Sequence, residues 1–155
     1  MTPRFSLQRI LELKERKEQA AAARLAEART AADAVRRAEH AIVSMREVGV
    51  SRRSAAAQRA HARIGDLQNL SFILERLEQH LDEVRAAVKK ADAQVDAAVT
   101  DFTEASKERQ VLDRLKEKKL EAALLEQADA DRKRMDDLAL SRFVQNEKAS
   151  KGSEE

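Results

Sequence analysis

The feature that most constrains this chain is a stripe of mostly apolar residues in which three-residue and four-residue steps alternate without interruption. Its members are Leu67, Leu70, Leu74, Leu77, Leu81, Val84, Val88, Ala91, Val95, Ala98, Phe102, Ala105, Arg109 and Leu112. An average step of about 3.5 residues aligns these side chains along one line of an α-helix, as in a coiled coil. Because a lone helix cannot bury this line, a second helix must pack against it.

The composition agrees with long helices and not with an average globular domain. Of the 155 residues, 37% are charged, and the chain has one Pro, three Gly and no Trp or Tyr. We therefore expect a single extended domain over residues 1–155. The absence of Cys excludes disulfides and fits a reducing compartment. Because no secretory signal and no apolar run of about 18 residues is found, we expect a soluble, cytoplasmic protein.

Residues 3–48 are expected to form the first helix, with Thr2 as its N-cap and Pro3 at its first position. Its apolar residues recur at helical spacing: Leu7, Ile10, Leu13, Ala20 to Ala23, Ala28, Ala31, Val35, Ala38, Ile42 and Met45. Residues 67–146 are expected to form the second helix, because nothing in this range breaks it.

The hairpin tip is expected within residues 49–66, where two turn signals compete. Gly49 is followed by Ser51, which could cap a following helix, and Gly65 precedes Asp66. We favour a turn at Gly49. The intervening stretch is rich in Ala and Arg and is itself prone to form a helix.

A turn at this place sets the pairing of the two helices. If Val48 meets Leu67, the numbers of paired residues add to about 115, and the stripe over 67–112 matches the first helix in length. This pairing buries Ile42 and Met45, which would lie near Leu74 and Leu70. The fold prediction is all-α: an antiparallel two-helix coiled-coil hairpin.

Past Leu112 the helix signal continues while the stripe shifts. The apolar positions are now Leu115, Leu120, Leu124, Ala128, Met135 and Leu138. Repeated four-residue steps unwind a coiled coil locally. Residues 113–143 are therefore expected to overhang the hairpin as a single helix, supported by ion pairs between neighbouring turns. Their exposed leucines indicate a binding partner. The polar residues 147–155 are expected to be disordered.

Net charge differs between segments: +3 over 1–48, +3 over 49–66, −3 over 67–112 and −1 over 113–155. Four arginines at the tip, Arg52, Arg53, Arg59 and Arg63, could be solvated or meet an acidic protein. Nucleic acid is disfavoured because no aromatic residues lie between these arginines.

No catalytic pattern is present. The histidines His40, His61 and His80 do not stand three or four residues apart, and no phosphate-binding glycine loop occurs. We predict no catalytic residues, no metal site, no cofactor and no enzymatic activity.

Two stretches resemble the FliJ family of flagellar export proteins. One is the opening FSLQRILELKERKE at residues 5–18. The other is LKEKKLEAALLE at residues 115–126, followed by RKRMDDLA at residues 132–139. The similarity covers nearly the whole chain in length and layout.

This resemblance implies a coiled-coil stalk similar to the central stalk of rotary ATPases. Its implied partners are an export ATPase hexamer, the cytoplasmic domain of the membrane export gate and export chaperones. Such a protein would be monomeric alone and peripheral at the inner membrane. The implied ATPase-binding residues lie in the overhang: Leu115, Lys116, Lys119, Leu124, Met135, Asp136 and Leu138.

For the export gate, Phe72 is the candidate that lies off the stripe, where an exposed aromatic residue could anchor a partner. Alternatively, Phe72 packs over the edge of the hairpin. Ile42 and Met45 stand near positions that the family uses for the gate. Two other functions stay open: a stalk of an injectisome secretion system, and a scaffold coiled coil formed by two chains.

Overall fold

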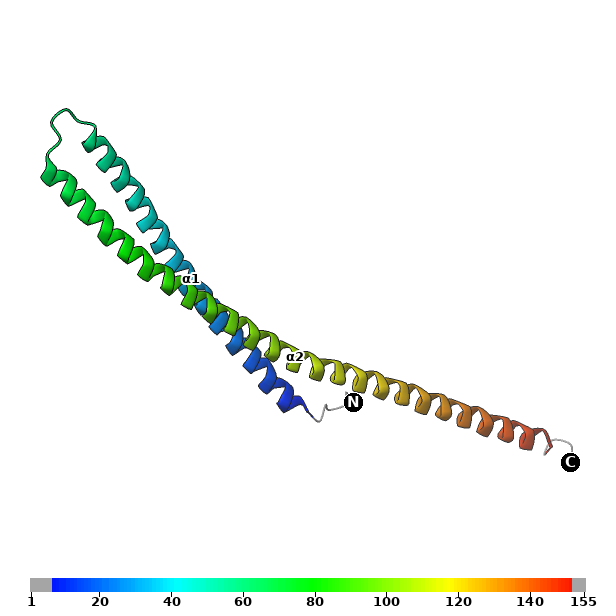
Figure 1. Cartoon of the computed structure of the whole chain (residues 1–155). Coiled ribbons are helices and arrows are strands. Elements are labelled where there is room, and N and C mark those ends of the chain that lie inside the picture. The colour runs from blue at the N-terminus through cyan, green and yellow to red at the C-terminus, as the bar shows by residue number, and fades with distance from the viewer. Residues whose placement is uncertain (1–6, 152–155) are drawn as a thin grey trace. The chain divides into compact units, whose positions relative to one another are not determined.

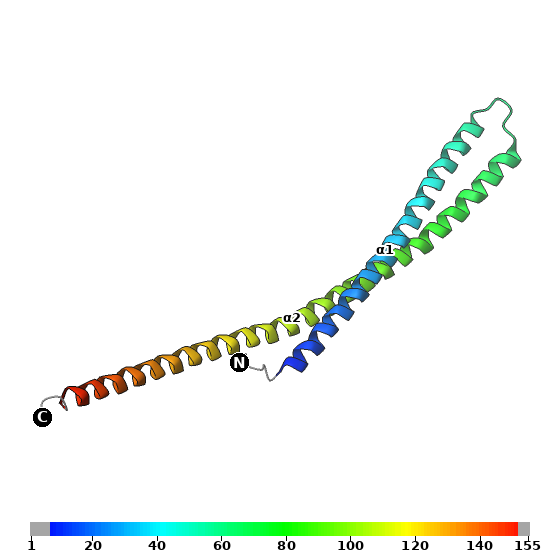
Figure 2. The ribbon, with the colours of Figure 1, turned by 180° about the vertical axis from the view of Figure 1, so that it is seen from behind.

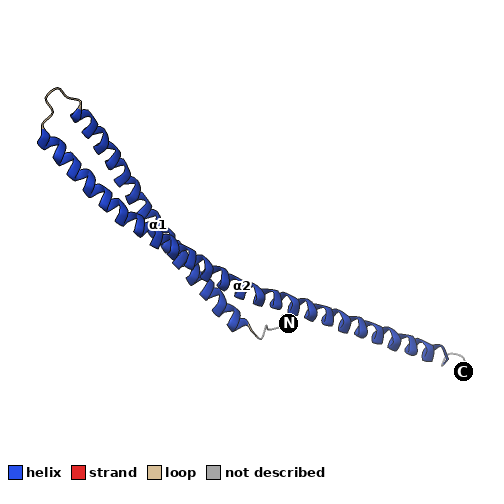
Figure 3. Cartoon of the chain, in the orientation of Figure 1, coloured by secondary structure: helices blue, strands red, loops and turns tan. Residues whose placement is uncertain are grey.

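The computed structural model describes residues 7–151, which are helical apart from Leu7 and one short connection. Helix α1 runs from Gln8 to Ala57 and helix α2 from Ile64 to Lys151, and no strand occurs in this range. The two helices pack against each other in opposite directions (Figure 1, Figure 3). The predicted all-α antiparallel hairpin with a longer second helix is confirmed.

Two units divide the chain. One unit comprises Glu15–Lys107 and holds the connection together with the two arms that it joins, which lie side by side in both views (Figure 1, Figure 2). The other unit combines the described residues up to Lys14 with those from Glu108 onwards, and so pairs the start of α1 with a later part of α2.

The chain turns at residues 58–63. The backbone N–H of Gln58 donates to the carbonyl of Ser54 (3.2 Å) at the end of α1, and the N–H groups of Asp66 and Leu67 donate to the carbonyl of Arg63 at the start of α2. The favoured turn at Gly49 is wrong, because α1 continues through this residue to Ala57. A glycine costs a helix only about 1 kcal/mol relative to alanine, which the packing at this site offsets.

The predicted stripe of α2 faces α1 along its whole length. All of its positions are buried or half-buried, from Leu67 to Leu112. The most buried are Leu74, Leu81, Ala91 and Ala105. Between Ile64 and Leu112, the only other half-buried residues are Asp92, Ser106 and Glu108. The period of about 3.5 residues therefore identified the packed face of this helix correctly.

The packed face of α1 differs from the predicted one. Ile10, Leu13 and Met45 are exposed. The residues that are buried or half-buried at heptad spacing are Leu7, Leu11, Lys14, Glu18, Ala21, Leu25, Ala28, Ala32, Val35, Glu39, Ile42, Arg46 and Gly49. Four of these are charged, which hid the pattern from a search for apolar residues. Long side chains can pack their aliphatic stems while the charged ends reach solvent or a partner.

The register of the hairpin also differs from the predicted one. Gly49 faces Leu74, so paired residue numbers add to 123 and not to about 115. The ion pair between Lys14 and Glu108 agrees with this register. The change follows from the turn, which lies further along the chain than Gly49. In this register small residues oppose large ones, or each other, at several layers: Ala21 with Phe102, Leu25 with Ala98, and Ala32 with Ala91. Ile42 and Leu81 form a layer of two large residues.

The expectations for the two ends of the chain fall partly outside the described residues. The predicted cap at Thr2 and Pro3 lies outside the described residues. Residues 147–151, expected to be disordered, belong to α2, while the expectation for 152–155 also falls outside the described part.

Candidate partner-binding surfaces

The largest exposed surface is the C-terminal segment of α2, which we define as residues 114–148. In the 123 register Gln8, the first residue of α1, stands opposite Leu115, so α1 provides no further partner beyond this point. Every side chain of the C-terminal segment is exposed except that of Ala123, which is half-buried. Within residues 7–148, this segment is thus a helix without a second helix along it.

The structure places all seven predicted ATPase-binding residues on this segment, and all are exposed: Leu115, Lys116, Lys119, Leu124, Met135, Asp136 and Leu138. They do not share one face. At 3.6 residues per turn, Leu124, Met135 and Leu138 fall within an arc of about 60°, whereas Asp136 lies on another side of the helix.

Leu120 completes an apolar face that the site prediction left out. Together with Leu124, Met135 and Leu138 it lies within the same arc of about 60°. We call these four residues the leucine–methionine face. Each of their side chains is between 44% and 68% exposed. Apolar side chains aligned on an unpacked helix are typical of a surface that a partner covers.

Blocks of positive and negative net charge alternate along the C-terminal segment. Residues 114–119 carry a net charge of +3, residues 121–131 a net charge of −4 and residues 132–134 a charge of +3. Arg134 and Asp131 form an ion pair within this segment (3.7 Å). Exposed pairs of this kind stabilise a helix by only about 0.3–0.5 kcal/mol each.

Sequence reasoning also missed Phe143, which is 67% exposed near the end of this segment. A signal was available, because the chain has only four aromatic residues, all Phe. Phe102 is half-buried against α1, and Phe5 lies outside the described residues. The remaining two, Phe72 and Phe143, are exposed, and aromatic residues are enriched among the anchors of protein interfaces.

A second exposed surface surrounds Phe72 on α2, in the unit formed by residues 15–107. Phe72 is 64% exposed, so most of its side chain is accessible to a partner. It lines a shallow depression on α2 with Ile73, Arg76, Leu77, Gln79, His80 and Glu83. Nδ1 of His80 lies 3.4 Å from a carboxylate oxygen of Glu83. Apolar and charged groups therefore stand next to each other here.

The other two gate candidates have opposite environments. Ile42 is 7% exposed and belongs to the packed face of α1, so its side chain is not accessible to a partner. Met45 is 59% exposed, because the register differs from the one that would bury it. The structure thus leaves Phe72 and Met45 available and encloses Ile42.

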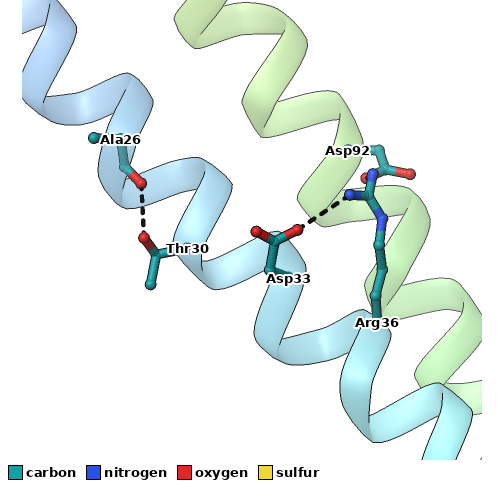
Figure 4. A network of polar contacts seen from close by, with 5 residues as sticks. All are labelled: Ala26, Thr30, Asp33, Arg36 and Asp92. Carbon is teal, nitrogen blue, oxygen red and sulfur yellow. Dashed lines mark hydrogen bonds and ion pairs between the residues drawn. The ribbon is translucent and has the colours of Figure 1, made fainter.

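Ion pairs join α1 to α2 along the sides of the hairpin. Nζ of Lys14 lies 2.8 Å from Glu108, and Arg46 pairs with Glu78. A guanidinium nitrogen of Arg36 on α1 lies 2.6 Å from Asp92 on α2, and another lies 3.4 Å from Asp33 one turn earlier on α1 (Figure 4).

The figure also shows Thr30, whose hydroxyl donates to the carbonyl of Ala26 (2.9 Å) within α1. A further cross-helix pair joins Arg85 to Glu39 (3.3 Å). Three arginines of the hairpin arms thus pair with carboxylates on the facing helix: Arg36, Arg46 and Arg85.

The His, Cys, Asp and Glu side chains that the structure describes form no group of three or more that could hold a metal ion. In the same part of the chain, no helix has the length and apolarity needed to cross a membrane.

Comparison with known proteins gives one family. Residues 3–148 match the family model described as the flagellar FliJ protein. No match was found among curated proteins or among solved structures.

Proposed function

The chain belongs to the flagellar FliJ protein family and is thus a component of the flagellar export apparatus, and from this premise we propose that it is a non-enzymatic coiled-coil stalk. In this proposal the C-terminal segment of α2 inserts into the hexameric ring of the export ATPase. The hairpin reaches towards the cytoplasmic domain of the export gate. The protein is then peripheral at the cytoplasmic side of the inner membrane.

The observation that carries the proposal is the exposed helix over residues 114–148. Isolated helices are only marginally stable in water, and most helices in proteins depend on packing against another element. A helix of this length with an apolar face on one side is therefore suited to enter a partner. A ring lumen encloses a single helix from all sides, which also accounts for charges all round the segment.

The gate contact is assigned to Phe72 and Met45. Both side chains are exposed, and both belong to the unit of residues 15–107, whereas the segment assigned to the ATPase belongs to the other unit. An interface anchored on an aromatic side chain with charged neighbours, here Arg76 and Glu83, is common in protein recognition. Export chaperones are further candidate partners, for which no separate surface is assigned.

Binding to the purified export ATPase hexamer tests the first assignment. We expect a chain ending at Asp113 to lose binding and the double variant Leu120→Ser/Leu124→Ser to bind at least about 10-fold more weakly. The matched control is Leu125→Ser, because Leu125 is exposed on the same segment but lies off the leucine–methionine face. Unchanged binding by the truncated chain would refute the assignment.

A scaffold formed by two chains is the alternative, because the leucine–methionine face could pair with a second copy. Sedimentation at increasing concentration separates the two. The stalk predicts a monomer of 17.4 kDa at all concentrations, whereas the scaffold predicts a dimer that forms as concentration rises.

A further inference from the structure

We propose that the hairpin tip, defined as residues 48–65, binds the anionic headgroups of a phospholipid membrane. This surface is distinct from those assigned to the ATPase and the gate. The inference rests on the charges of the tip, on their lack of carboxylate partners and on the apolar side chains beside them.

The tip has no acidic residue. Its charged residues are Arg52, Arg53, Arg59 and Arg63, while Glu47 and Asp66 are the acidic residues that flank it. In a chain with 28 acidic and 30 basic residues, an 18-residue stretch with only positive charge is a local concentration of one sign. A cluster of this size attracts an anionic surface.

Among the described residues, the tip arginines lack the cross-helix ion pairs that three arginines of the arms make. Arg36, Arg46 and Arg85 each pair with a carboxylate on the facing helix. In the described part of the chain, no ion pair joins a tip arginine to a carboxylate, and all four tip arginines are exposed. Their charge is therefore not neutralised within the described fold.

The turn gathers these charges at one end of the hairpin. Arg52 and Arg53 lie in the last turns of α1, while Arg59 and Arg63 lie in the connection that closes this end (Figure 1). Ile64, the first residue of α2, is 73% exposed beside them. Basic residues around an exposed aliphatic side chain suit an interface in which the cations meet phosphates and the aliphatic group enters the headgroup region.

Phospholipid is favoured over two other anionic partners. The planar guanidinium group of arginine forms paired hydrogen bonds with carboxylate and phosphate oxygens alike. Phospholipid is favoured over an acidic protein because the exposed Ile64 can enter the headgroup region of a membrane. Nucleic acid also offers phosphates, but residues 48–65 contain no aromatic side chain on which a base could stack. The exposed Ile64 gains nothing from a nucleic-acid backbone.

The expected strength is modest. Each basic residue near an anionic membrane raises binding by about 5-fold at low salt, so removing two arginines should weaken it about 30-fold. Screening shortens the range of these charges as salt rises, and binding should weaken accordingly.

Co-sedimentation with vesicles tests the inference on the full chain. We expect binding to vesicles of equal parts phosphatidylglycerol and phosphatidylcholine, and little to phosphatidylcholine alone. Arg52→Gln/Arg53→Gln should bind the anionic vesicles about 30-fold more weakly, and Ile64→Ser should also weaken binding. The charge-matched control is Arg132→Gln/Lys133→Gln on the C-terminal segment, which should bind like the unchanged protein.

Circular dichroism of each variant establishes that the helices are intact. Equal binding to both kinds of vesicle would overturn the proposal. So would equal losses in the tip variant and its charge-matched control, since binding would then depend on net charge alone. Tighter binding to duplex DNA than to anionic vesicles at the same salt would assign the tip to nucleic acid instead.

Discussion

Leu74 of α2 packs over Gly49 of α1 so closely that a Cβ atom on Gly49 would stand 2.8 Å from Cδ2 of Leu74. Glycine thus suits this position inside α1 because Leu74 occupies the space of a side chain, and not because the backbone needs a conformation that only glycine adopts. Because Leu74 is itself 7% exposed, it has little room to move aside. This contact sets the register of the hairpin.

Replacing this glycine tests the contact. Gly49→Ala gains up to about 1 kcal/mol of helix propensity but forces Leu74 to shift, at a cost of about 1–3 kcal/mol. We expect the free energy of unfolding in urea, followed by circular dichroism, to fall by up to about 2 kcal/mol. Gly65→Ala is the control, because nothing lies within 4 Å of its Cβ position. A Gly49→Ala protein more stable than the Gly65→Ala protein would contradict this packing.

The centre of the packed face should carry much of the stability. Leu81 is completely buried, and in the 123 register it opposes Ile42. We expect Leu81→Ala to lower the free energy of unfolding by about 2–4 kcal/mol through lost contacts and the cavity left behind. Leu125→Ala, at an exposed leucine, should change it by less than about 0.5 kcal/mol. Similar losses in the two variants would mean that Leu81 is not packed as described.

The register can be measured through an ion pair. Arg46 and Glu78 pair across the hairpin with side chains 42% and 48% exposed, so their coupling in a double-mutant cycle should be about 0.5–1 kcal/mol. In the register predicted from the sequence, Glu78 would face Arg37 instead. We expect the Arg37–Glu78 cycle to give a coupling near zero. A coupling for Arg37–Glu78 with none for Arg46–Glu78 would instead support the register in which paired residue numbers add to about 115.

The two helices were predictable to different degrees. The packed face of α2 was read correctly because its positions are nearly all apolar. In α1 the corresponding positions include Lys14, Glu39 and Arg46, whose heads pair across the hairpin, so apolarity alone pointed to Ile10 and Met45. Because the packed face of α1 includes these charged positions, a search limited to apolar residues could not identify it.

The turn was predicted at the wrong place because a glycine can either end a helix or make room inside a helix for a side chain of the facing helix. At Gly49 the missing side chain makes room for Leu74, and nothing in the local sequence distinguishes this from a helix end. The turn predicted at Gly49 led to a register that is wrong by eight residues and to the wrong expectation that Met45 is buried. The exposed C-terminal segment was predictable, because the second helix is so much longer than the first that it extends past it in either register.

The leucine–methionine face was only partly predictable. Leu124, Met135 and Leu138 were identified, but Leu120 was left out of the site and Asp136, which lies on another side of the helix, was included. Helical position at 3.6 residues per turn separates these two.

The central claim is that residues 114–148 form a helix without a partner in the free protein and become the ATPase-bound segment. Hydrogen exchange of the full chain, alone and with the export ATPase hexamer, tests both halves. Alone, amides of 120–148 should exchange much faster than those of 74–105, because helix without tertiary packing opens readily. With the hexamer, we expect new protection concentrated in 114–148. Slow exchange of this segment in the free protein, or protection by the hexamer elsewhere and not here, would contradict the account.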